Sequence, residues 1–243
     1  MQQSSNPALS SKAFGRFAST DANDKMTVGG TLRKMGYAFA VLLAAAAVGW
    51  AIFPQFGVTI PFWTIWVGLG LTLVAGFWAA FKANIFSVTT YAILEGAYLG
   101  IVSRLFETAY NGIVLQAILI TLAVTLGMFF LYSTGIVKVT KKLRSVIIIA
   151  TVGVFIYLVL ELILSLVIPG FLGVVTSGVT GIVIALVIVL IAALNLLLDF
   201  DAITKGAENN LSKKAEWYGA FGLLVTLVWL YVSILRLLGA SRR

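Results

Sequence analysis

The sequence contains no cysteine and no histidine, and only 11% of its 243 residues are charged. The lack of both residues excludes a disulfide scaffold, a zinc site built from cysteine and histidine, a cysteine nucleophile and a Ser-His-Asp triad. Soluble domains carry about 25% charged residues, and this chain has too few to cover a water-soluble globule. We therefore predict a membrane protein.

Hydrophobic residues make up 60% of the chain and gather in long runs. A helix needs about 20 apolar residues to cross a bilayer. The runs do not alternate between apolar and polar residues, so they favour helices over the strands of a barrel. The predicted fold class is an all-α transmembrane bundle of seven helices. The predicted spans are 36–53, 62–81, 88–106, 112–132, 146–168, 178–198 and 217–238.

The chain divides into a polar tail, residues 1–34, and a transmembrane domain, residues 35–243. Lysine and arginine mark cytoplasmic loops, and they occupy every second predicted loop. The rule predicts a multi-pass protein with a cytoplasmic N-terminus and a C-terminus outside. We expect it in the plasma (inner) membrane. The basic residues of the two richest loops are Lys138, Lys141, Lys142, Arg144, Lys205, Lys213 and Lys214.

Carboxylates in or near the spans need an explanation, because a charge at mid-span costs about 2.5–3.5 kcal/mol on insertion scales. Such a carboxylate is either neutralised by protonation, a hydrogen bond or an ion pair, or it lines the path of an ion. The sequence predicts that the sixth span ends just before two of them, where the helix macrodipole disfavours acids. The candidates for an ion path or proton sensing are Asp199, Asp201, Glu95, Glu216 and Glu161.

Several basic residues are candidate partners for these acids. Lys205 follows Asp201 by one helical turn, and Arg104 can pair with Glu107 on a helix surface. Arg236 is expected to extend toward the outer interface. Beside Glu95, the pattern Gly96 to Gly100 favours close approach of a neighbouring helix.

Several functions are excluded by missing residues. The last span has no lysine for a retinal Schiff base, the chain has no nucleotide-binding motif, and no nucleophile–base pair is visible, so we predict no enzyme. Oxygen ligands suit hard cations such as Ca²⁺. We expect no cofactor, although Ca²⁺ could be a transported ion. Without histidine, a pH response has to come from carboxylates.

The motifs resemble the Bax inhibitor family, also called the transmembrane Bax inhibitor motif proteins. Residues 198–203, Leu-Asp-Phe-Asp-Ala-Ile, resemble the family pattern [YF]-D-x-[QN]-x-I, and residues 234–239 resemble the end of its last helix. Residues 4–7 and 216–223 resemble its bacterial YccA-like branch. The resemblance covers nearly the whole chain, and its specific part is the last stretch from Asp199 onward.

The resemblance implies a seven-helix bundle with the last helix at its centre and a pH-dependent Ca²⁺ leak. In the family, an aspartate on the sixth helix and one on the seventh share a proton. Asp199 matches the first position, and Asp201 matches the neighbouring amide position. The second position falls on Thr226, and no acid lies between Trp217 and Arg236.

Two functions from different classes follow. The first is a leak channel for Ca²⁺ or another cation, gated by Asp199 and Asp201 as a coupled pair near the cytoplasmic end of helix six. The alternative is a regulator or partner of a membrane protease, with the polar tail as its ligand and no transport activity. A transporter is less favoured, because no proline interrupts a predicted span. The expected partners are the bilayer, Ca²⁺ or H⁺ and a membrane protease, without nucleic acid.

Overall fold

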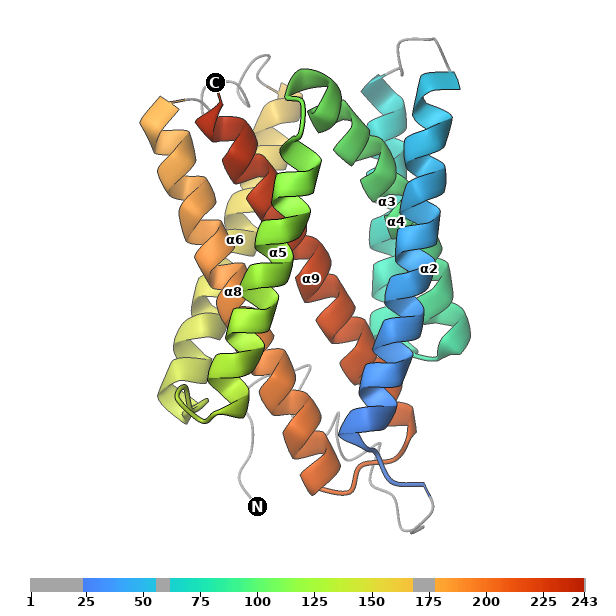
Figure 1. Cartoon of the computed structure of the whole chain (residues 1–243), viewed down its shortest axis with the longest axis vertical. Coiled ribbons are helices and arrows are strands. Elements are labelled where there is room, and N and C mark those ends of the chain that lie inside the picture. The colour runs from blue at the N-terminus through green and yellow to red at the C-terminus, as the bar shows by residue number, and fades with distance from the viewer. Residues whose placement is uncertain (1–23, 56–61, 168–177, 243) are drawn as a thin grey trace. The chain divides into compact units, whose positions relative to one another are not determined.

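The computed structural model describes residues 24–55, 62–167 and 178–242, and these residues form helices joined by short connections (Figure 1). An isolated antiparallel β-bridge joins Lys25 to Ser212. The helices are α2 (Val28–Gln55), α3 (Phe62–Phe81), α4 (Ile85–Ala109), α5 (Ile113–Ser133), α6 (Lys141–Val167), α8 (Gly178–Glu208) and α9 (Lys214–Ser241).

Six of these helices are long and apolar enough to cross a membrane: α2, α4, α5, α6, α8 and α9. This confirms a helical membrane protein. In α3, the apolar stretch Ile65–Phe81 is shorter than the other six, so the seventh span stays a prediction.

Two boundaries differ most from those expected from the sequence. Helix α8 does not end at residue 198 but continues to Glu208, because polar residues replace apolar ones there without interrupting the helical backbone. Helix α2 begins at Val28, within the stretch assigned to the polar tail. Residues 1–23 of that tail lie outside the described residues.

The chain divides into two compact units, which we describe separately. Unit 1 comprises the chain up to Val102 together with Asp201–Leu224, and unit 2 comprises Ser103–Phe200 and Val225–Arg243. Helices α4, α8 and α9 each contribute residues to both units.

In unit 1, glycines bring α2 and α4 into backbone contact. A Cβ on Gly96 would overlap the carbonyl oxygen of Leu42, and one on Gly100 would overlap that of Ala46. Close approach through small residues is how helices associate in lipid, where apolar burial gives little driving force. The prediction of a packed interface at Gly96 and Gly100 is therefore confirmed, with α2 as the neighbour.

In unit 2, side-chain hydrogen bonds join helices that are distant in sequence. Asn195 on α8 donates to Thr151 on α6 at 2.7 Å, and the hydroxyls of Ser103 on α4 and Tyr231 on α9 lie 2.7 Å apart. In bilayers such bonds contribute about 0.6–2 kcal/mol each. They constrain the rotation of helices whose surfaces are mostly apolar.

Candidate functional site

Asp199 and Asp201 lie inside α8, not at its end as the sequence suggested. The macrodipole argument therefore does not apply to them, since it acts within the last turn. Two residues apart on a helix, the side chains point about 200° from one another. Each has its own surroundings, and their coupled titration stays a prediction.

Asp199 faces α9 within unit 2. Its carboxylate lies within hydrogen-bonding reach of the Thr226 hydroxyl, the residue at the position where the family pattern has its second aspartate. Thr226 is buried. The other carboxylate oxygen of Asp199, Oδ2, is shielded from solvent and has no hydrogen-bond partner among the described residues. This oxygen is an unused acceptor inside the protein.

Asp201 belongs to unit 1 and is ion-paired. Its Oδ2 accepts a hydrogen bond from Lys205 Nζ at 2.8 Å, one turn further along α8. The Asp201 side chain is 8% exposed, whereas that of Lys205 is 50% exposed. The lysine therefore reaches from the surface to neutralise a buried acid, as its spacing allows.

Glu161 is also ion-paired, within unit 2. Its Oε1 lies 2.7 Å from Arg236 Nη2, which links α6 to α9. The guanidinium of Arg236 therefore contacts a buried carboxylate on the neighbouring helix, and its extension toward the outer interface stays a prediction. Each pairing partner satisfies the charge of the other.

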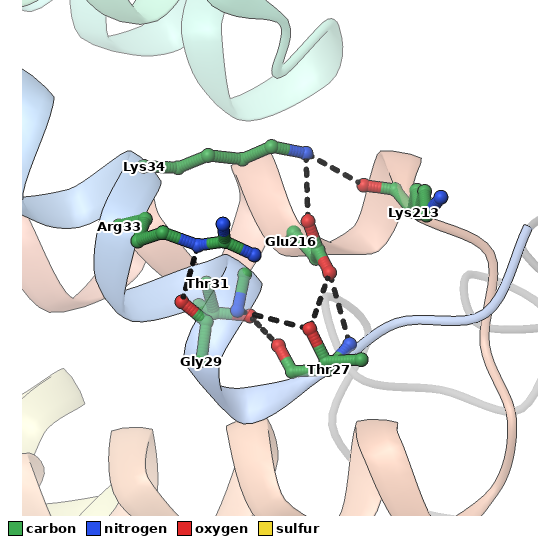
Figure 2. A network of polar contacts seen from close by, with 8 residues as sticks. Thr27, Gly29, Thr31, Arg33, Lys34, Lys213 and Glu216 are labelled. Carbon is green, nitrogen blue, oxygen red and sulfur yellow. Dashed lines mark hydrogen bonds and ion pairs between the residues drawn. The ribbon is translucent and has the colours of Figure 1, made fainter.

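Glu216 lies in the first turn of α9 and not in a loop, and it is buried. Figure 2 shows the network around it in unit 1. Its Oε1 accepts hydrogen bonds from the Thr27 backbone N–H at 2.9 Å and from the Thr27 hydroxyl at 3.1 Å. Its Oε2 pairs with Lys34 Nζ at 2.9 Å, and Lys34 also donates to the Lys213 carbonyl. Glu216 thus fastens the start of α2 to the start of α9.

The remaining predicted residues occupy different places. Glu95 lies on α4 in unit 1, within hydrogen-bonding reach of Thr72 on α3. Arg104 is half-buried on the part of α4 that belongs to unit 2. Glu107 accepts hydrogen bonds from the backbone N–H groups of Gly112 and Val114, at 2.6 and 3.1 Å, and so satisfies the first amides of α5.

No group of three or more aspartate, glutamate, cysteine or histidine side chains gathers to hold a metal ion in the part of the chain that the structure describes. The predicted carboxylates are instead separate, and most have a partner of their own. Asp199 differs from the ion-paired acids, because its described neighbour is a neutral hydroxyl.

Unit 2 contains a cavity of about 170 Å³ between helices α4, α6, α8 and α9. Its lining is mostly apolar and aromatic, with Tyr110, Tyr157 and Trp229, while Ser233 and Arg236 add polar groups. Trp229 follows Thr226 by one turn of α9. The cavity thus lies next to Thr226 along α9, but neither Thr226 nor Asp199 is among its lining residues.

Sequence reasoning missed three contributors: Lys34 as the partner of Glu216, Arg236 as the partner of Glu161, and Thr226 as the direct neighbour of Asp199. The first two carry no local signal, because their partners lie on other helices. The family pattern placed Thr226 at the position of the second aspartate, but it gave no reason to expect that a threonine there would contact Asp199.

The comparison with known families agrees with the motifs. A family model described as Bax inhibitor 1 like matches residues 6–243, nearly the full length. A search of curated proteins finds no match to this chain. The matched region includes Asp199, Thr226 and Arg236. Because the match spans both units and every helix described above, the chain belongs to the Bax inhibitor 1 like family.

Proposed function

We propose that this protein is a pH-sensitive cation leak channel for Ca²⁺, with Asp199 on α8 as its controlling carboxylate. The observation that carries the proposal is the contact between Asp199 and Thr226, together with the shielded Oδ2 that has no partner among the described residues. The resemblance to the family supplies the ion and the leak activity. The same resemblance suggests the bacterial YccA-like branch.

The chemistry of the pair supports a response to pH. An ionised carboxylate only accepts hydrogen bonds, whereas a protonated one also donates, and a threonine hydroxyl can do both. Protonation of Asp199 therefore reverses the direction of its bond to Thr226. A change of this kind between two helices can shift the balance between two packings.

The contacts of α9 support a central position for this helix in a bundle of seven spans. The basic loops support a cytoplasmic N-terminus and a C-terminus outside. Within unit 1, α9 contacts α2, α3 and α4, and within unit 2 it contacts α4, α6 and α8. The contacts that support this are Lys34–Glu216, Tyr218–Phe81, Tyr91–Phe221, Ser103–Tyr231, Glu161–Arg236 and Asp199–Thr226.

Calcium-dye flux into proteoliposomes, measured from mildly acidic to mildly alkaline pH, tests the proposal. Asp199→Asn keeps the shape of the side chain but removes the titration, so flux should lose its pH dependence. Asp201→Asn is the matched control, two residues away and paired with Lys205, and it should retain the pH dependence of the native chain.

Absence of flux from folded protein at every pH would overturn the leak. The alternative function, regulation of a membrane protease through the polar tail, would then become the leading hypothesis. Deletion of residues 1–23, which lie outside the described residues, would be expected to abolish that regulation without unfolding the helices.

A further inference from the structure

Helices α3 and α4 of unit 1 meet in a regular antiparallel register (Figure 1). Gly68 faces Tyr98, where an added Cβ would lie 2.9 Å from the Tyr98 Cδ2 atom. Two turns later Gly76 faces Tyr91, where a Cβ would lie 3.4 Å from Cε2. Each tyrosine of α4 thus packs over a glycine of α3.

Glu95 lies between the two tyrosines on α4, and Thr72 lies between the two glycines on α3. Glu95 lies within hydrogen-bonding reach of the Thr72 hydroxyl. That hydroxyl already donates its hydrogen to the Leu69 carbonyl at 3.0 Å. Because a hydroxyl has one hydrogen and two lone pairs, the lone pairs of Thr72 are left for Glu95, and a protonated carboxyl is the form that donates to them.

The surroundings of Glu95 offer no cation within the described part of the chain. The ion pairs found there involve other acids, namely Asp201, Glu161 and Glu216. The titratable groups that face Glu95 are the phenols Tyr91 and Tyr98 of its own helix. On the side of α2, the adjoining Gly96 meets Leu42 and Ala45, which are apolar. From α9, Phe221 packs edge-on against Tyr91.

We propose that Glu95 is a proton-binding carboxyl site within the α3–α4 pair, distinct from Asp199, and that it donates a hydrogen bond to Thr72. The ligand is a proton. A carboxylate inside a span requires a cation, water or a proton, and the geometry supplies an acceptor for the proton. Loss of that proton would remove the donor of this bond, and Thr72 could bond the ionised carboxylate only by releasing the Leu69 carbonyl. The proposal does not depend on any ion leak.

A hydrophobic carbodiimide tests the site directly, since it reacts with protonated carboxyls that water-soluble reagents do not reach. The carboxyl proton moves to a nitrogen of dicyclohexylcarbodiimide, the carboxylate oxygen bonds to its central carbon, and an O-to-N acyl shift leaves a stable N-acylurea. Nothing is released, so mass spectrometry of the digested protein shows one added reagent. We expect this adduct on Glu95 of the full chain in liposomes, decreasing as pH rises.

Two variants sharpen the test. Glu95→Gln resembles the neutral carboxyl in shape, so it should fold normally and carry no adduct in this segment. Thr72→Val removes the acceptor and should change labelling of Glu95 at least several-fold. Glu161, which is paired with Arg236, is the internal control and should stay unlabelled. Absence of an adduct on native Glu95, with the protein folded and another carboxyl labelled, would overturn the proposal, as would labelling that does not vary with pH.

Discussion

Glu161 on α6 and Arg236 on α9 form an ion pair within unit 2, with 2.7 Å between Oε1 and Nη2. The Glu161 side chain is 4% exposed, and that of Arg236 is 37% exposed. A carboxylate buried among apolar helices is tolerated only when its charge is compensated. Arg236 therefore explains why Glu161 can lie within a span without being an ion-path residue.

Removal of one partner should destabilise the protein more than removal of both. Arg236→Leu alone should lower the free energy of unfolding by about 3 kcal/mol or more, because the Glu161 carboxylate stays buried without compensation. Glu161→Leu alone should cost less, because the Arg236 side chain is partly exposed to solvent. The double substitution Glu161→Leu with Arg236→Leu should recover much of that loss. Thermal unfolding in detergent, followed by tryptophan fluorescence, measures the difference.

The exposed residue Lys142 provides a control for this experiment, since Lys142→Gln removes a charge without breaking a described ion pair. Losses that simply add in the double variant would show that Glu161 and Arg236 contribute independently, contrary to the contact between them.

A second carboxylate at position 226 should change how the Asp199 site titrates. Thr226→Asp places an acid beside Asp199, and two neighbouring carboxyls titrate as one coupled unit in two macroscopic steps. If the proposed leak exists, its dependence on pH should change from one step to two. The measurement is the same calcium-dye flux, recorded at closely spaced pH values.

Two other substitutions at position 226 separate the hydroxyl from the charge. Thr226→Ser keeps the hydroxyl and should retain the native pH profile, whereas Thr226→Val keeps the shape and removes the bond to Asp199. A Val variant with an unchanged profile would mean that the contact between Thr226 and Asp199 has no part in gating.

The network at Glu216 should stabilise the start of α2 (Figure 2). Glu216→Gln loses the charge that Lys34 and Thr27 share, and hydrogen bonds to charged groups contribute about 1.5–3 kcal/mol. We expect a loss of this size in the free energy of unfolding. Hydrogen exchange of the first turn of α2 should also become faster, which mass spectrometry can detect.

Arg33→Gln is the matched control, because Arg33 neighbours Lys34 in sequence but only donates to the Gly29 carbonyl at the surface in the described structure. Its substitution should leave both readings within error. Equal acceleration of exchange in the Arg33 and Glu216 variants would show that the region responds to charge in general and not to this network.

The positions of the helices could be predicted from the sequence, because long apolar runs are a strong local signal. The end of α8 could not. The apolar run stops near Leu198, but the backbone continues to Glu208, since a helix does not have to end where the bilayer does. That one error placed Asp199 and Asp201 together at a helix end, when they point to different surroundings.

The candidate acids could also be identified from the sequence, but their partners could not. Thr27 and Glu216 are 189 residues apart, and Glu161 and Arg236 are 75 apart. Such contacts depend on which helices are neighbours, and hydropathy does not encode that choice. Lys205 was identifiable because it lies on the same helix as Asp201, four residues away.

The number of spans can be tested by labelling introduced cysteines. The native chain has no cysteine, so it gives no background labelling. Single-cysteine variants at the exposed positions Lys25 and Lys82 flank the pair α2 and α3. If α3 crosses the membrane, a membrane-impermeant maleimide should label both from the cytoplasmic face only, and Ser241→Cys from the outer face only. Asn209→Cys, in the basic loop after α8, reports the cytoplasmic face in the same assay.

Labelling of Lys25→Cys and Lys82→Cys from opposite faces would instead mean that α3 does not cross. The chain would then have six spans, which equals the number of described helices long and apolar enough to cross a membrane. With a cytoplasmic N-terminus, its C-terminus would also be cytoplasmic. The basic residues Arg242 and Arg243 would in that case obey the positive-inside rule, but the basic loops at 138–144 and 205–214 would lie outside and break it, so Asn209→Cys should then be labelled from the outer face. The maleimide pattern thus decides whether the terminal arginines are an exception or a signal.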